Sequence, residues 1–138
     1  MSRILAIDHG TVRMGIALSD ELRMIAQPLK YIPAEPLEDF WKSLGEIVHE
    51  KEVEMILVGM PRNMNGTYGP AAEKVRAFIE LLRERLPEIT VRTWDERLTS
   101  SEANRLLIQG NVRRGQRKEK VDKMAAAILL QSYLDATS

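Results

Sequence analysis

Apolar residues fall along the first third of the chain in short runs that predict strands. Residues 3–8 form an unbroken apolar run that ends in an acid, which is typical of a strand covered on both faces. Residues 13–20 alternate bulky and small side chains, which predicts a second strand joined to the first by a hairpin through residues 9–11. A third strand is expected over residues 25–32, ended by Pro33. The chain should therefore open with three antiparallel strands.

After residue 33 the apolar spacing alternates between that of a helix and that of a strand. Residues 37–51 predict a helix and residues 55–59 a strand. A second helix is expected from Pro70 until Pro87 terminates it, and residues 89–94 predict a fifth strand. The pattern is that of an α/β chain, a mixed sheet with helices packed on it.

The last third of the chain predicts two helices joined by a basic segment. Residues 99–102 have the form of a capping box that starts a helix, and Gly110 is placed to stop it. Residues 111–118 are expected to form a loop leading into the final helix. The inward positions predicted for that helix are Val121, Met124, Ala125, Ile128 and Leu129.

Length and composition indicate one ordinary folded domain over residues 1–138. The hydrophobic share is 44% and the charged share 29%, which excludes a disordered or fibrous chain. The absence of cysteine excludes disulfides, thiolate nucleophiles and cysteine-ligated zinc. No apolar run approaches the roughly 20 residues that span a bilayer, and the start lacks a signal-peptide pattern, so a cytoplasmic protein without membrane contact is expected.

Charge is balanced overall, at 20 basic and 20 acidic residues, but it is polarised along the chain. Acids are concentrated in residues 35–54, and basic residues near the start of the last helix. Such a basic segment would neutralise backbone phosphates without selecting a sequence, although a solvated loop has the same composition. Its basic residues are Arg113, Arg114, Arg117, Lys118, Lys120 and Lys123.

Acidic residues stand at the ends of several predicted elements. Asp8 follows the first apolar strand, where a desolvated carboxylate requires a partner or an ion; a turn-capping role is the alternative. Asp95 and Glu96 end the fifth strand, where acids could also serve the dipole of a following helix. Asp122 shares a helix face with apolar residues, and a first-turn position would explain it equally.

Three acids that converge on one edge of a sheet are suitable ligands for hard divalent cations such as magnesium. Two such ions roughly 3.5–4 Å apart could activate water and stabilise the leaving oxygen of a phosphodiester. Sequence spacing does not establish that Asp8, Glu96 and Asp122 meet.

Four motifs in order give the chain a close resemblance to a known family. The motifs are Ala6-Ile7-Asp8-His9-Gly10-Thr11, Val58-Gly59-Met60-Pro61 with Asn63-Met64-Asn65-Gly66, Asp95-Glu96-Arg97-Leu98-Thr99, and Lys120-Val121-Asp122 with Ala125-Ala126. On these motifs the chain resembles, nearly end to end, the YqgF (RuvX) family of RNase H-like proteins, described both as nucleases that trim the small-subunit ribosomal RNA precursor and as Holliday junction resolvases.

The resemblance implies an RNase H-like fold whose five-stranded sheet has the order 3-2-1-4-5. It also implies Asp8, Glu96 and Asp122 as metal-binding catalytic acids, with Asp95 a secondary candidate. His9 departs from a more commonly apolar family position, and Asn65 from a common Asp.

Other residues have both a functional and a structural interpretation. Arg97 could orient Glu96 or clamp a phosphate, or it could form a structural ion pair. Arg62 and Asn63 could contact a sugar-phosphate backbone from the loop after the fourth strand. His9 could shuttle a proton or could be an incidental turn residue.

The resulting hypothesis is a nuclease that uses two Mg²⁺ or Mn²⁺ ions to cleave structured nucleic acid, acting on precursor ribosomal RNA, as a monomer or weak homodimer. The alternatives are a resolvase of branched DNA, a non-catalytic nucleic-acid binder, and an actin-like ATP phosphotransferase. The last shares an Asp-x-Gly-Thr loop like residues 8–11, but it pairs two such domains.

Overall fold

The computed structural model describes residues 2–62, 65–96 and 114–137, with side chains in the last segment from residue 124 onward. A five-stranded mixed sheet of order β3-β2-β1-β4-β5 forms its centre. The predicted strand order is therefore confirmed. The strands are β1 (Arg3–Asp8), β2 (Arg13–Ser19), β3 (Ala26–Pro33), β4 (Val53–Met60) and β5 (Thr90–Asp95). The first three are antiparallel neighbours, whereas β4 runs parallel to both β1 and β5.

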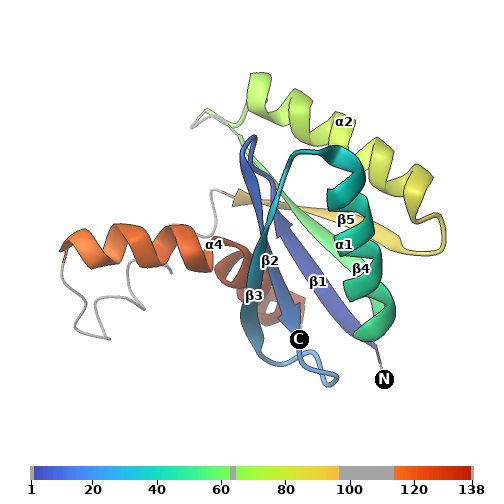
Figure 1. The fold of residues 1–138 in the computed structure, drawn as a ribbon. Coiled ribbons are helices and arrows are strands. Elements are labelled where there is room, and N and C mark those ends of the chain that lie inside the picture. The colour runs from blue at the N-terminus through green and yellow to red at the C-terminus, as the bar shows by residue number, and fades with distance from the viewer. Residues whose placement is uncertain (1, 63–64, 97–113, 138) are drawn as a thin grey trace.

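Helices cover both faces of this sheet (Figure 1). Helices α1 (Leu37–Glu50) and α2 (Pro70–Arg85) lie on one face, and α4 (Arg114–Thr137) lies on the other. The predicted helix from residue 99 lies outside the described residues. One prediction was wrong: the expected loop over residues 111–118 is helical from Arg114 onward. Gly115 disfavours a helix by only about 1 kcal/mol relative to alanine, and its neighbours are good helix formers.

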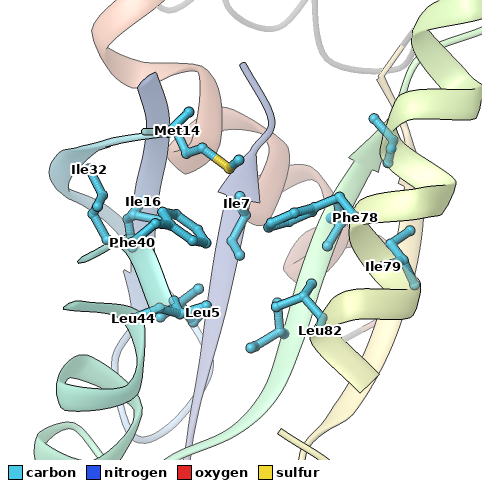
Figure 2. Close-up of a cluster of buried hydrophobic side chains, with 14 of the residues drawn as sticks. Leu5, Ile7, Met14, Ile16, Ile32, Phe40, Leu44, Phe78, Ile79 and Leu82 are labelled. Atoms are coloured by element: carbon cyan, nitrogen blue, oxygen red, sulfur yellow. The ribbon is translucent and has the colours of Figure 1, made fainter. Parts of the chain in front are cut away.

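The apolar run of β1 is buried on both faces, as its sequence predicts. Leu5 and Ile7 face the larger cluster under α1 and α2, and Figure 2 shows Phe40 and Phe78 approaching them from those helices. Ile4 and Ala6 face α4. The alanines on that side leave room for the α4 backbone to come close to the sheet. The α4 side chains buried there are Ala126, Ala127, Ile128, Leu129, Leu130 and Leu134, so Ile128 and Leu129 are inward as predicted, whereas Met124 and Ala125 are only half-buried.

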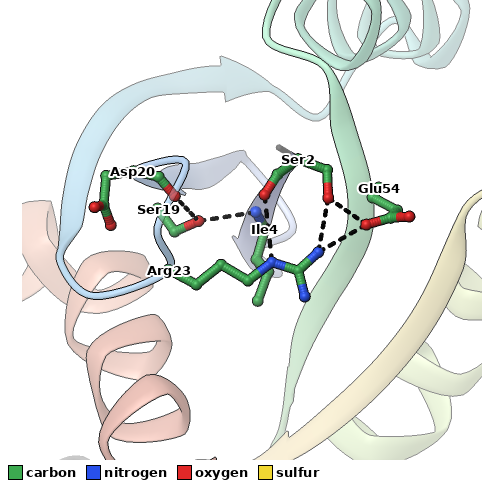
Figure 3. A network of polar contacts seen from close by, with 6 residues as sticks. All are labelled: Ser2, Ile4, Ser19, Asp20, Arg23 and Glu54. Carbon is green, nitrogen blue, oxygen red and sulfur yellow. Dashed lines mark hydrogen bonds and ion pairs between the residues drawn. The ribbon is translucent and has the colours of Figure 1, made fainter. Parts of the chain in front are cut away.

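The predicted third strand is present as β3, and it forms an exposed edge of the sheet. Ile25 precedes it and is 57% exposed, and Leu29 is also exposed. At the turn before β3, Arg23 adopts a φ of 57° and donates to the carboxylate of Glu54 at 2.8 Å (Figure 3). The Ser2 hydroxyl bonds the same carboxylate, which links the starts of β1 and β4 to this turn. This polar network lies at the end of the sheet opposite to Asp8.

Candidate active site

The sheet topology brings Asp8 and Glu96 together. Asp8 is the last residue of the central strand β1, and Glu96 directly follows β5, two strands away. Because β1, β4 and β5 are parallel, their carboxyl ends meet at one edge of the sheet. The side chains of Asp8 and Glu96 are hydrogen-bonded to each other there. The predicted convergence of these two acids is thus observed in the structure.

Crowding of negative charge defines the electrostatics of this pair. Burial raises the pKa of Glu96 to about 7, and the charges of Asp8 and Asp95 act in the same direction. A hydrogen bond from protonated Glu96 to Asp8 raises this pKa further. Without a cation the pair therefore retains a proton near neutral pH. A divalent cation would replace that proton, and carboxylate oxygens are the ligands that such ions prefer.

A glycine on the intervening strand makes room for the Glu96 side chain. A Cβ at Gly59 of β4 would lie 2.6 Å from Glu96 Oε1 and 2.9 Å from Glu96 Cγ. These separations are too short for any real side chain, so the Glu96 carboxylate lies directly over the bare backbone of β4. The sequence singled out Gly59 only as part of a family motif; the structure indicates its physical role.

The two acids open onto a cavity of about 310 Å³ between the β1–β2 turn and the start of α2. Lys74 of α2 lines this cavity and makes no ion pair with a carboxylate in the described part of the chain. Sequence reasoning missed Lys74, because a lysine on a helix flank carries no signal of what faces it. The lining consists of Asp8, His9, Gly10, Thr11, Pro61, Pro70, Ala71, Lys74, Val75 and Glu96.

His9 packs at the wall of the cavity. Its ring centre lies 5.0 Å from that of Phe78 on α2. Burial lowers the pKa of the His9 imidazole, and the charge of Lys74 lowers it further. At neutral pH the side chain is therefore uncharged, and Lys74 is the cation at this wall.

Arg62 and Asp95 extend the site on its other side. Arg62 Nη1 lies 3.5 Å from Asp95 Oδ2, and both side chains are partly buried. Asp95 ends β5 opposite Met60, so the ion pair links the loop after β4 to the strand that carries Glu96. Asp95 acts on Glu96 through its charge.

Comparison with known proteins identifies the family. The RuvX family model, described as "Holliday junction resolvase", matches residues 2–136. The chain belongs to the RuvX family. A protein of Desulforamulus reducens named "Putative pre-16S rRNA nuclease" is 49% identical over 134 residues, which cover 97% of each chain. A protein of the same name from Symbiobacterium thermophilum is 48% identical, over 97% of this chain and 92% of its own length.

Solved structures show the same fold at low sequence identity. RuvC of T. thermophilus, solved in complex with a Holliday junction substrate, aligns with a TM-score of 0.54 at 16% identity, over 99% of this chain and 96% of its own. The Holliday junction resolvase of fowlpox virus aligns with a TM-score of 0.54 at 13% identity. The alignment covers 97% of this chain and 99% of the viral protein. The predicted RNase H-like fold is thereby confirmed.

Several predicted site residues lie outside the described part of this RuvX chain. Asp122 belongs to α4, but its side chain is not described. Arg97, Asn63 and Arg113 are outside the described residues altogether. Among the side chains that are described, no group of three or more acidic or histidine residues could hold a metal. The described helices also include none that is long and apolar enough to cross a membrane. The basic residues of α4 whose side chains are not described are Arg114, Arg117, Lys118, Lys120 and Lys123.

Proposed function

We propose that this protein is a divalent-metal-dependent nuclease that hydrolyses phosphodiester bonds of structured nucleic acid, acting through one domain over residues 1–138. The observation that carries the proposal is the hydrogen-bonded pair Asp8 and Glu96, crowded enough to raise the pKa of Glu96 to about 7. Such a pair is stabilised by cations. Its position beyond the carboxyl ends of parallel strands is where α/β sheets bind ligands.

Asp8, Glu96 and, from the sequence, Asp122 are the proposed ligands of Mg²⁺ or Mn²⁺. Two bound ions would supply Lewis-acid activation of water and neutralise charge on the leaving oxygen. Asp95 contributes negative charge beside this group. Lys74 faces the same cavity and supplies a cation for a substrate phosphate. The basic side chains of residues 113–120 would add non-specific phosphate contacts.

We propose precursor 16S ribosomal RNA, cut at its 5′ end, as the substrate. The names of the relatives from D. reducens and S. thermophilum support this choice, because they are 48–49% identical over nearly the whole chain. Branched DNA is the second candidate, which the description of the family model favours.

The test is cleavage of a precursor 16S RNA fragment and of a four-way DNA junction under identical metal and salt. Asp8→Asn and Glu96→Gln should each lower the rate at least about 100-fold, since each removes several kcal/mol of transition-state stabilisation. Glu46→Gln, on the exposed side of α1, is the matched control and should cleave normally. Full activity of Asp8→Asn with an unchanged melting temperature would refute the proposed mechanism. Preference for RNA over the junction would support the first substrate, and the reverse preference the second.

A further inference from the structure

The guanidinium groups of two arginines lie over the ring of one tyrosine, Tyr68. Tyr68 lies in the loop before α2 and is 45% exposed. The guanidinium carbon of Arg62 is 4.6 Å from its ring centre, and that of Arg76 on α2 is 4.5 Å away. The two guanidinium carbons are therefore no farther apart than the sum of these distances. Both guanidinium groups thus contact one aromatic ring.

The stacked arrangement leaves donors available at the guanidinium edges. The face of an aromatic ring attracts cations, and a planar guanidinium stacked on it keeps its N–H groups in its own plane. Arg76 bonds Glu73 at 2.6 Å through Nη1, one of its three nitrogens. Arg62 pairs with Asp95 only loosely, at 3.5 Å, and its buried Nε has no hydrogen-bond partner among the described residues. The N–H groups of a guanidinium are well suited to bind the oxygens of a phosphate.

The ion pair to Asp95 ties this cluster to the acidic site. Asp95 immediately precedes Glu96 and its charge acts on the Glu96 carboxyl, so the ion pair links Arg62 to the acidic site. A nucleic-acid strand carries one negative charge per nucleotide. A strand with one phosphate at the acids would thus bring a neighbouring phosphate toward the arginines.

From this geometry we infer that Tyr68 holds Arg62 and Arg76 as a guanidinium pair that binds a backbone phosphate flanking the cleaved bond. The inference rests on the proposed nuclease function and adds a substrate contact to it. Arg62 and Arg76 touch the phosphate. Tyr68 is a positioning residue, whose ring contacts both guanidinium groups.

The test measures binding of a labelled single-stranded RNA oligonucleotide, and of DNA of the same sequence, by fluorescence anisotropy in EDTA over a range of salt. Arg76→Ala should raise Kd roughly tenfold for both strands. The slope of log K against log salt should become shallower by about 0.7, as expected for one lost phosphate contact on a single strand. Tyr68→Leu should raise Kd severalfold, and Tyr68→Phe should bind as the wild type does.

Arg85→Ala is the matched control. Arg85 lies on the same helix, has the same 47% side-chain exposure as Arg76, pairs with Glu38 and stacks near Trp41. The Arg85→Ala protein should bind both oligonucleotides as the wild type does. The inference fails if Arg76→Ala has the same Kd and salt slope as Arg85→Ala, or if Tyr68→Phe raises Kd as much as Tyr68→Leu does. Neither result would contradict the proposed metal-dependent cleavage. If the wild type neither binds nor cleaves either nucleic acid, the proposed function fails and this inference fails with it.

Discussion

Gly59 shows how one absent side chain shapes the site. Its hydrogen occupies the space where a Cβ would meet Glu96 Oε1 at 2.6 Å. Gly59→Ala should therefore displace the Glu96 carboxylate from Asp8 and lower metal affinity and cleavage by about 10- to 100-fold, the usual range for a change that misorients a ligand. Isothermal titration with Mn²⁺ and a cleavage assay would measure both effects.

Gly45 of α1 provides the control for this substitution. A Cβ at Gly45 meets no heavy atom within 4 Å. Gly45→Ala should raise the free energy of unfolding by about 0.5–1 kcal/mol, because alanine suits a helix interior, and it should leave cleavage unchanged. Equal metal affinity in the Gly59→Ala and Gly45→Ala proteins would contradict the role given to Gly59.

The pKa of Glu96 makes stability depend on pH. Since this pKa is about 7 in the folded protein, against 4.5 for an ordinary glutamate, the folded state holds the proton more tightly than the unfolded chain does. The associated stability is fully present below pH 4.5 and is lost as pH rises through 7. Allowing for partial solvent screening, the loss is about 1–2 kcal/mol. Urea unfolding in EDTA should show this loss for the wild type and not for Glu96→Gln.

Among the elements, α4 covers the face of the sheet that α1 and α2 leave open. Leu130 of α4 is fully buried against it. Polar contacts hold α4 in position on the sheet. Trp94 Nε1 of β5 donates to Ser132 Oγ at 3.1 Å. Gln131 accepts from the Ala26 amide at 2.8 Å and donates to the Met24 carbonyl at 3.1 Å. The docking of this C-terminal half determines where the helix that carries Asp122 runs.

Truncation of Leu130 tests this docking. Leu130→Ala should lower the free energy of unfolding by about 2–5 kcal/mol, because it removes buried methyl groups and leaves a cavity. Leu22→Ala, in the turn between β2 and β3 where the side chain is 62% exposed, should change it by less than about 0.5 kcal/mol. Similar urea midpoints for the two variants would show that α4 contributes little to the fold.

At the scale of the whole molecule, metal binding should raise the melting temperature of the protein. A ligand that binds only the folded state raises the melting temperature with its concentration. Mg²⁺ or Mn²⁺ should raise it more at pH 8 than at pH 5, because protonated Glu96 cannot ligate at the lower pH. Differential scanning fluorimetry of the wild type and of Asp8→Asn would measure this. An equal shift in both proteins would mean that the ions bind elsewhere.

The sequence determined the elements and much of their order, because these depend on local periodicity. The apolar run of residues 3–8 predicted a strand buried on both faces, and Pro70 marked the start of α2. Acids after two strands pointed to the edge of the sheet where the site lies. The loop expected over residues 111–118 was wrong, because the cost of Gly115 in a helix is small and the residues that flank it favour a helix.

Only the tertiary structure decided which side chains meet. The contact between Asp8 and Glu96, the clearance over Gly59 and the stacking of Arg62 and Arg76 on Tyr68 join residues from separate elements. Their distances depend on strand register and on the way each helix packs against the sheet. Register and packing are set by the whole core at once, so no local pattern in the sequence encodes them.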